Sequence, residues 1–232
     1  YGLEQVEGVR VLRCPLWVPR RPSGLTRLLH LASFALSSIG PLLAQLRWHP
    51  DIVITAAPAF FCAPGALLLG WLCGRRTITW LHVQDFELDA AFELGLLKGR
   101  FLRSPAEYWE RRTLCGFDRV SSISGAMVQK LRVKGVDASR SVLLPNWVNL
   151  EVIRPQWGPA RQDNSYRREL GIGPDKLVLM YSGSMNKKQG LDLLAEVMYQ
   201  LADLPQLVWL LAGEGPTKAE LVSATRGLSN VR

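Results

Sequence analysis

Ten consecutive residues of this 232-residue chain, 181–190, have the composition of a loop that holds phosphate. The segment reads Tyr-Ser-Gly-Ser-Met-Asn-Lys-Lys-Gln-Gly and begins where an apolar run typical of a β-strand ends. Gly183 and Gly190 allow a backbone to approach a ligand closely, and Lys187 or Lys188 can offset the charge of a diphosphate. The spacing matches neither a Walker loop nor the GxGxxG dinucleotide fingerprint. Taken alone, the segment predicts a phosphate-binding loop, with an ordinary surface loop as the alternative.

A second glycine turn follows a later apolar run and contains Gly213, Glu214 and Gly215. A turn of this kind at the end of a strand can lie beneath a bound sugar or nucleotide. A glycine-rich tight turn without a ligand is the alternative.

Polar side chains also crowd the end of a predicted strand in the first half of the chain. His82 can donate a hydrogen bond to a sugar hydroxyl or stabilise a developing positive charge through its backbone carbonyl, and Asp85 can orient an acceptor hydroxyl. The alternative is that Asp85 and the two acids after it are surface residues that lead a helix. The chain has no GxSxG elbow, so a Ser-His-Asp hydrolase is not indicated. The other two histidines, His30 and His49, are interpreted as structural.

These residues need strands whose ends meet at one edge of a sheet. Apolar and β-branched runs predict strands at 9–12, 51–55, 77–81, 120–123, 142–144, 177–181 and 207–212, of which 51–55 is expected to be buried on both faces. Helical spacing and capping signals predict helices at 25–46, 61–74, 104–115, after Ser124, at 191–204 and at 218–225, with Ser104 to Glu107 as a capping box. Strands that alternate with helices predict an α/β fold with parallel sheets, which bind ligands beyond the carboxyl ends of their strands.

The uncharged stretch 52–74 is long enough to cross a membrane. Because Pro58 and Pro64 interrupt it after a β-branched run, a buried strand, a turn and a core helix are the better interpretation. No signal-peptide pattern heads the chain, and the chain begins at Tyr1 without an initiator Met. We therefore expect the natural protein to extend beyond the sequence given.

The net charge of +8 is unevenly distributed. Residues 1–150 contain 18 Lys and Arg against 11 Asp and Glu, whereas residues 151–232 contain 10 against 9. The basic half predicts contact with an anionic membrane surface, with a solvated surface as the alternative, and no nucleic-acid motif accompanies it. The four cysteines show no CxxC pair and no metal-ligand spacing with histidine, so neither a disulfide framework nor a zinc site is indicated and a cytoplasmic location is expected.

In order along the chain, five segments resemble the retaining GT-B glycosyltransferases of family four, especially the branch that makes colanic acid and other exopolysaccharides. The segments are HVQDFELDAAF at 82–92, VSSISGAMVQKLRVKGV at 120–136, LLPNWVN at 143–149, YSGSMNKKQGLDLL at 181–194 and LLAGEGP at 210–216. The resemblance implies two Rossmann-like, doubly wound domains facing a cleft. Residues 1–153 would form an acceptor-side domain that lacks its first strands, 154–166 the connection, and 167–232 the start of the domain that binds the donor nucleotide.

The resemblance also assigns roles to single residues. It places His82 or Asp85 at the catalytic position on the acceptor side, with Ser124 and Asn146 near the cleft. Ser184 stands where many members carry Arg, and Gln189 where they carry Lys, so neutralisation of the diphosphate must shift to Lys187 or Lys188. The donor-binding set implied by the family is Gly183, Ser184, Lys187, Lys188, Gln189, Gly190, Gly213, Glu214 and Gly215.

The resemblance implies that a hexose or deoxyhexose passes from a nucleotide sugar to a lipid-linked glycan with retention, without a metal, at the cytoplasmic face of the plasma membrane. The family's paired glutamates would follow Arg232, and its first strand would precede Tyr1. We therefore expect little or no transferase activity from these 232 residues alone. A nucleotide-sugar epimerase of the same fold and an inactive membrane-associated fragment are the alternatives.

Overall fold

The computed structural model describes residues 1–20, 24–57, 60–74, 76–93, 100–155 and 164–232. They form two compact units, unit 1 (Tyr1–Trp147) and unit 2 (Val148–Arg232). The connection expected at 154–166 includes residues 156–163, which lie outside the described residues.

Unit 1 contains a four-stranded parallel sheet in the order β3-β4-β5-β6. The strands are β3 (Ile52–Ala57), β4 (Ile78–Val83), β5 (Arg119–Ser122) and β6 (Ser141–Leu143). All four lie within two residues of their predicted positions, and their parallel pairing confirms the prediction from the alternation of strands and helices. The carboxyl ends of the strands therefore share one edge.

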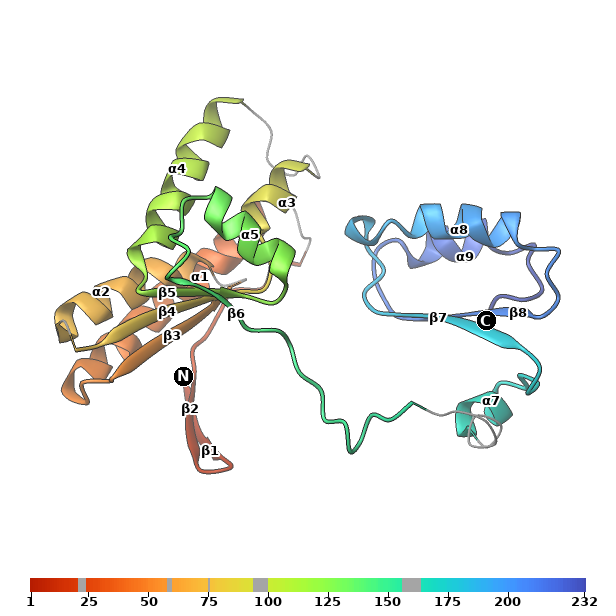
Figure 1. The fold of residues 1–232 in the computed structure, drawn as a ribbon, viewed down its shortest axis with the longest axis horizontal. Coiled ribbons are helices and arrows are strands. Elements are labelled where there is room, and N and C mark those ends of the chain that lie inside the picture. Colours follow the sequence, from red (N-terminus) through yellow and green to blue (C-terminus); the bar gives the residue numbers. More distant parts are fainter. Residues whose placement is uncertain (21–23, 58–59, 75, 94–99, 156–163) are drawn as a thin grey trace. The chain divides into compact units, whose positions relative to one another are not determined.

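Three helices cover one face of this sheet: α2 (Ala63–Cys73), α4 (Arg100–Gly116) and α5 (Gly125–Val133) (Figure 1). Their buried residues join those of β3, β4 and β5 in one core around Phe117, Leu114 and Leu131. A short 3-10 turn, Phe60–Cys62, leads from β3 into α2. Pro58 and residue 59 lie outside the described residues, and the rest of the uncharged stretch 52–74 is a strand, a turn and a packed helix, as predicted.

The expectation that both faces of the second predicted strand are buried is wrong. In β3 burial alternates, with Val53, Thr55 and Ala57 buried and the residues between them exposed. Ile52 and Ile54 are 49% and 66% exposed, because the helices named above all pack on the opposite face. A run of apolar residues predicted the strand correctly but could not predict which of its faces is covered.

The capping box expected at Ser104 is also wrong. Helix α4 already begins at Arg100 and contains Pro105 in its interior. The Glu107 side chain, which was expected to cap the helix, accepts a 2.7 Å hydrogen bond from Arg103 Nε one turn earlier. An i,i+4 ion pair within a continuing helix therefore replaces the predicted start.

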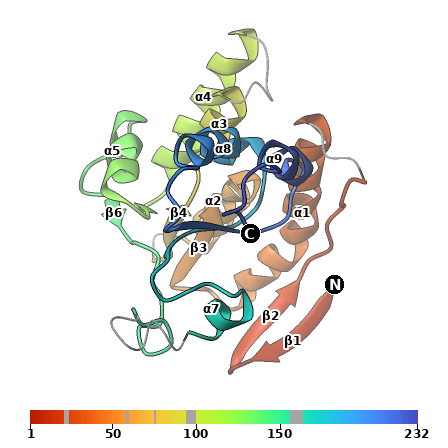
Figure 2. The same cartoon turned by 90° about the vertical axis from the view of Figure 1, so that its right-hand side faces the viewer.

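A hairpin of two antiparallel strands, β1 (Gly2–Val6) and β2 (Val9–Arg13), runs beside helix α1 (Gly24–Ala44) (Figure 2). Tyr1 and Ser37 tie the two elements together: Tyr1 Oη donates to the Ser37 carbonyl at 2.9 Å, and Ser37 Oγ donates to the Pro15 carbonyl at 2.6 Å. Only β2 was predicted. The turn residues Glu7 and Gly8 both have positive φ, but Glu-Gly is a weak signal for such a turn.

Helix α1 and the 3-10 turn after it, Gln45–Arg47, are also long and apolar enough to cross a membrane. Among the described helices, the stretch Leu28–Arg47 alone meets that length and hydropathy, and none of it is buried within the structure. The sequence had instead directed attention to 52–74, because its run without a charged residue spans 23 residues, against 19 for residues 28–46.

Unit 2 contains two parallel strands, β7 (Leu177–Ser182) and β8 (Leu207–Ala212). Helices α8 (Leu191–Gln200) and α9 (Lys218–Ala224) each follow a strand, as predicted, and α7 (Ser165–Glu169) precedes β7. A small core holds the helices against the strand ends and consists of Met185, Leu191, Ala195 and Leu221.

Candidate functional site

The two strand-end loops of unit 2 lie side by side. Ser182 pairs with Ala212 at the last position of the β7–β8 ladder. Backbone hydrogen bonds continue the pairing past the strands, from Gly183 N to the Ala212 carbonyl at 3.0 Å and from Met185 N to the Glu214 carbonyl at 2.8 Å. The structure therefore brings together the two glycine-rich segments that the sequence had identified separately.

The glycines of the second loop are required by this contact. A Cβ at Gly213 would lie 1.9 Å from the Gly183 carbonyl oxygen, and one at Gly215 would lie 2.0 Å from the Met185 carbonyl oxygen. Both distances are far inside van der Waals contact. Close packing of the two loops accounts for these glycines, whereas the sequence had suggested a turn that lies beneath a bound sugar or nucleotide, with a tight turn without a ligand as the alternative.

Side-chain hydrogen bonds shape the first loop from within. Asn186 Oδ1 accepts from Lys188 N at 3.0 Å, and Asn186 Nδ2 donates to Ser184 Oγ at 2.8 Å. Tyr181 Oη donates to the Ser184 carbonyl at 2.8 Å. Sequence reasoning had given Asn186 and Tyr181 no role. Asn186 caps the short 3-10 turn Lys187–Gln189. Asn is a recognised turn residue whose side chain binds the backbone two residues later, so this cap could have been predicted from the sequence.

The loop ends at Gly190, which adopts a left-handed conformation with φ 62° and ψ 38°. Gly190 is also the residue before the first turn of α8, and no side chain caps that helix. The first backbone N–H groups of a helix have no partner within the helix, and the amino end of a helix favours anions. Lys187 and Lys188, both exposed, precede this end, while Asp192 lies within its first turn. The arrangement can bind a phosphate through backbone amides and lysine.

The remaining members of the predicted set are also at these loops. Ser184 and Gln189 are exposed, and Glu214 forms an i,i+4 ion pair with Lys218. All nine predicted donor-binding residues thus lie in the two adjoining loops of unit 2.

The predicted catalytic residues belong to unit 1. His82 is the penultimate residue of β4, flanked by Ala56 on β3 and Ser121 on β5. It is 9% exposed, and its Nδ1 lies 2.8 Å from Ser121 Oγ. Asp85 lies two residues beyond the strand and is exposed. The two residues therefore differ in access to solvent, and sequence reasoning missed the partner on the neighbouring strand.

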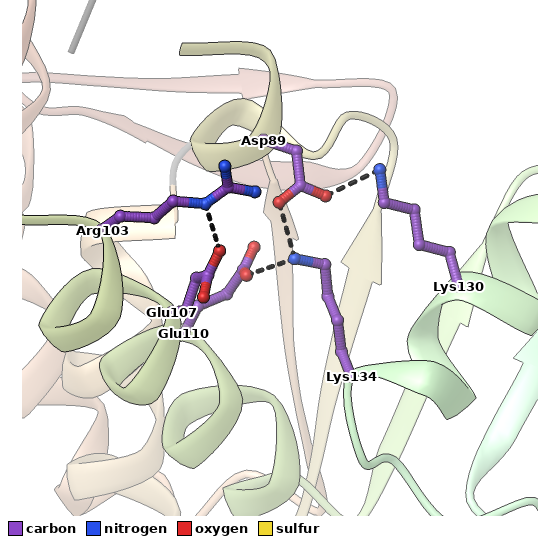
Figure 3. A network of polar contacts seen from close by, with 6 residues as sticks. All are labelled: Asp89, Arg103, Glu107, Glu110, Lys130 and Lys134. Atoms are coloured by element: carbon purple, nitrogen blue, oxygen red, sulfur yellow. Dashed lines mark hydrogen bonds and ion pairs between the residues drawn. The ribbon is translucent and has the colours of Figure 1, made fainter. Parts of the chain in front are cut away.

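Helix α3 (Glu87–Glu93), which follows Asp85, is held by a polar network (Figure 3). Asp89 forms ion pairs with Lys130 at 2.7 Å and Lys134 at 2.8 Å, and Lys134 also binds Glu110 of α4 at 2.5 Å. The network joins α3 to α4 and α5. Asp89, one of the acids that crowded this strand end in the sequence, is therefore engaged in anchoring the segment after His82 and Asp85.

The network shifts the pKa values of its members. Burial alone would raise the pKa of Asp89, but the hydrogen bonds from Lys130 and Lys134 outweigh it and lower that pKa. Burial raises the pKa of Glu110 despite the hydrogen bond from Lys134. Burial would lower the pKa of Lys134, but its hydrogen bonds to Asp89 and Glu110 raise it. Asp89 and Lys134 thus stay charged as a pair over a wide pH range.

Ser124 and Asn146 were expected near a cleft. Ser124 Oγ accepts a hydrogen bond from Met127 N at 3.2 Å and caps α5, as the sequence also predicted. Asn146 is exposed, next to the last residue of unit 1. Unit 1 also has a groove of about 980 Å³ between the hairpin and α1, which contains none of the predicted residues.

Comparison with known proteins adds an independent finding. Residues 2–147 match the family described as glycosyl transferase 4-like domain. The chain is 43% identical over 227 residues to the putative colanic acid biosynthesis glycosyl transferase WcaI of Escherichia coli (strain K12), covering 96% of this chain and 54% of that protein. It is 22% identical over 141 residues to the alpha-galactosylglucosyldiacylglycerol synthase of Streptococcus pneumoniae, covering 60% and 34%. The chain spans about half the length, or less, of these curated relatives.

Solved structures agree on the fold. The crystal structure of Anabaena Alr3699/HepE in complex with UDP aligns with a TM-score of 0.62 at 16% identity, covering 85% of this chain and 52% of that one. The apo form of the lipopolysaccharide outer core galactosyltransferase WaaB aligns with a TM-score of 0.54 at 15% identity, covering 85% and 47%. These likenesses confirm the predicted GT-B fold.

Proposed function

Because the chain belongs to the glycosyl transferase 4-like family, we propose that its protein transfers a sugar from a nucleotide-sugar donor in the biosynthesis of a cell-surface polysaccharide such as colanic acid. The observation that carries the proposal is the pair of adjoining loops in unit 2. They combine the uncapped amino end of α8 with Lys187 and Lys188. That combination suits the diphosphate of a nucleotide sugar.

Diphosphate binding would also supply much of the catalysis. In transfer with retention, the bond between the sugar C1 and the diphosphate oxygen breaks while the acceptor oxygen bonds to C1 on the same face. The acceptor proton passes to the departing diphosphate. Lysine and helix amides that offset the growing negative charge stabilise this transition state without a metal.

His82 and Asp85 are proposed to act on the acceptor side. His82 is held in place by the strand pairing of β4 and β5, whereas Asp85 stands exposed just beyond the strand. A hydrogen bond from His82 and an orienting contact from Asp85 would position the acceptor hydroxyl for attack.

The acceptor is proposed to be a lipid-linked glycan at the cytoplasmic face of the membrane. Helix α1 exposes Leu29, Leu36 and Ile39, which are 52%, 70% and 41% accessible. Beside it, Arg10 and Arg47 line the groove of about 980 Å³ together with apolar side chains. Exposed apolar groups next to basic ones on a unit with excess positive charge suit an anionic lipid surface.

A transfer assay tests the proposal. The protein that carries this sequence is supplied with radiolabelled UDP- and GDP-sugars and lipid-linked acceptors, and Lys188→Ala and His82→Ala are compared with it. Since a charge-assisted hydrogen bond contributes about 1.5–3 kcal/mol, Lys188→Ala should lower kcat/KM by about tenfold or more. Lys176→Ala is the matched control, because Lys176 lies just before the opposite end of β7 and binds the Pro205 carbonyl. Absence of sugar transfer from every donor would contradict the proposal.

A further inference from the structure

Trp80, His82 and Ser121 form a hydrogen-bonded chain on the sheet face opposite the main core of unit 1. His82 and Ser121 are directly paired across β4 and β5, and Trp80 lies two residues before His82 on the same face. Trp80 Nε1 and His82 Nδ1 each lie 2.8 Å from Ser121 Oγ. Ser121 has no exposed surface and His82 is 9% exposed. A buried hydroxyl therefore joins the indole to the imidazole.

One arrangement of protons satisfies all three groups. An indole N–H can only donate, so Ser121 Oγ accepts from Trp80. The hydroxyl proton of Ser121 then has a single acceptor among the described residues, His82 Nδ1. If Nδ1 carried a proton instead, two donors would point at one oxygen and the buried Ser121 proton would have no acceptor, which is unfavourable.

We propose that Ser121 is a positioning residue that fixes neutral His82 as the Nε2–H tautomer. Nε2 has no hydrogen-bond partner among the described residues. In this tautomer Nε2 can donate a hydrogen bond to a ligand oxygen but cannot accept a proton. Resting on the proposed function, this assigns His82 the role of a donor to a sugar or phosphate oxygen, and excludes the role of general base at Nε2.

His30 provides a contrast within the same chain. Its Nδ1 lies 2.6 Å from the Trp17 carbonyl oxygen, which can only accept. Neutral His30 must therefore carry its proton on Nδ1, the opposite tautomer to His82. The chain has three histidines, so their signals can be separated and assigned by single substitutions.

Nitrogen-15 NMR of the histidine rings tests the assignment directly. The spectrum is recorded without substrate at about pH 8.5, above the range near pH 6.5 in which imidazoles ordinarily titrate. His82 should show a protonated Nε2 and a bare Nδ1, and His30 the reverse pattern. A protonated Nδ1 on His82 would overturn the proposal, whether or not the protein transfers sugar.

Two neighbouring serines give a matched pair of variants. Ser121→Ala removes the hydroxyl that faces Nδ1 and should convert His82 to a tautomer mixture. Ser121→Thr keeps a hydroxyl at this position and should retain the Nε2–H form. Ser122→Ala is the control, because Ser122 is equally buried but donates to the Val83 carbonyl at 2.6 Å on the other face. An unchanged His82 spectrum in Ser121→Ala, or an equal change in Ser122→Ala, would refute the role of Ser121.

A second pair of variants separates donor from acceptor at position 82. Gln offers an amide N–H at similar reach, whereas Glu offers only carboxylate oxygens. In the transfer assay His82→Gln should keep about tenfold more activity than His82→Glu, the change that corresponds to about 1.4 kcal/mol. Equal activity of the two variants would contradict the donor role. If no variant and no parent protein transfers sugar, the proposed function fails while the NMR result still decides the tautomer.

Discussion

Gly213 packs against Gly183 so closely that a Cβ at position 213 would lie 1.9 Å from the Gly183 carbonyl oxygen. The two residues belong to different loops that continue the pairing of β7 and β8 beyond the sheet. The geometry of the candidate phosphate loop therefore depends on a glycine outside that loop.

Gly213→Ala should destabilise unit 2 by about 2–3 kcal/mol, because the methyl group meets backbone and cannot be accommodated by a side-chain rotation. Gly227→Ala is the control, since its Cβ would meet only Tyr199 Oη at an ordinary 3.6 Å. Its effect should stay within about 0.5 kcal/mol. Hydrogen exchange of the β7 and β8 amides in urea measures both effects, and it reports on unit 2 even if the two units unfold separately. Equal stability of the two variants would show that the loops are not packed in this way.

Gly190→Ala should cost about 1–2 kcal/mol because residue 190 has φ 62°, a left-handed conformation that a Cβ disfavours. No atom lies within 4 Å of the added Cβ, so the cost comes from the backbone alone. Asn tolerates this conformation better than Ala, and Gly190→Asn should therefore be the milder change. Thermal unfolding should show the parent chain as the most stable, Gly190→Asn next and Gly190→Ala last. A Gly190→Ala variant more stable than Gly190→Asn would contradict the prediction.

Lys134→Met should destabilise unit 1 by about 3 kcal/mol, because it leaves the buried carboxylate of Glu110 without its partner. Lys130→Met is the matched control. Lys130 is 42% exposed and contacts only Asp89 among the acids of the network, so its loss should cost below about 1 kcal/mol. Urea unfolding measures both variants, and similar losses in the free energy of unfolding for Lys134→Met and Lys130→Met would contradict the central position of Lys134.

The same variant has a predicted pH dependence. The pKa of Asp89 is lowered in the folded state, so its contribution to the free energy of unfolding is fully present above the ordinary pKa of 3.8. That contribution is lost as the pH falls through the folded pKa. The pKa of Lys134 is raised in the folded state, so its contribution to the free energy of unfolding is fully present below the ordinary pKa of 10.5. That contribution is lost as the pH rises through the folded pKa. The stability difference between the parent chain and Lys134→Met should be larger at pH 7 than at acid pH below the lowered pKa of Asp89 or at alkaline pH above the raised pKa of Lys134. A difference that does not change with pH would rule out the ionic origin.

Leu36→Ser should weaken binding to vesicles that contain phosphatidylglycerol, because it removes an exposed apolar side chain from α1. Leu193→Ser, which changes a 64% exposed leucine on α8 of unit 2, is the matched control and should bind like the parent chain. Sedimentation with anionic and neutral vesicles measures the binding. Equal binding by both variants would exclude α1 as the membrane-contacting element.

Local patterns predicted most elements because each depends on residues close in sequence. The apolar runs at 177–181 and 207–212 became β7 and β8, and Ser124 caps α5 as its position suggested. The error at β3 arose because distant helices decide which face of the strand is covered, and nothing local indicated that only one face would be. The error at Glu107 was local: Arg103 lies only four residues earlier, and its i,i+4 pair with Glu107 competes with the capping role that the sequence suggested.

The candidate site follows the same division. The glycines and lysines of 181–190 were recognisable from composition. The contact of Gly213 with Gly183 joins the loops after two neighbouring strands, and that of Ser121 with His82 joins two neighbouring strands. The residues of each pair are 30 or more positions apart, so no spacing in the sequence could reveal either contact. Parallel pairing predicts which strand ends meet, but the register that pairs Ser121 with His82 comes from the folded sheet.

The most direct test of the phosphate site is an NMR titration of this 232-residue chain with inorganic pyrophosphate and with UDP. Saturable shifts are expected at the backbone amides of residues 183–193 and 213–217, and Lys188→Ala should weaken them. Shifts confined to unit 1, or no saturable shift with either ligand, would contradict the assignment of these loops as the site that holds the donor's diphosphate.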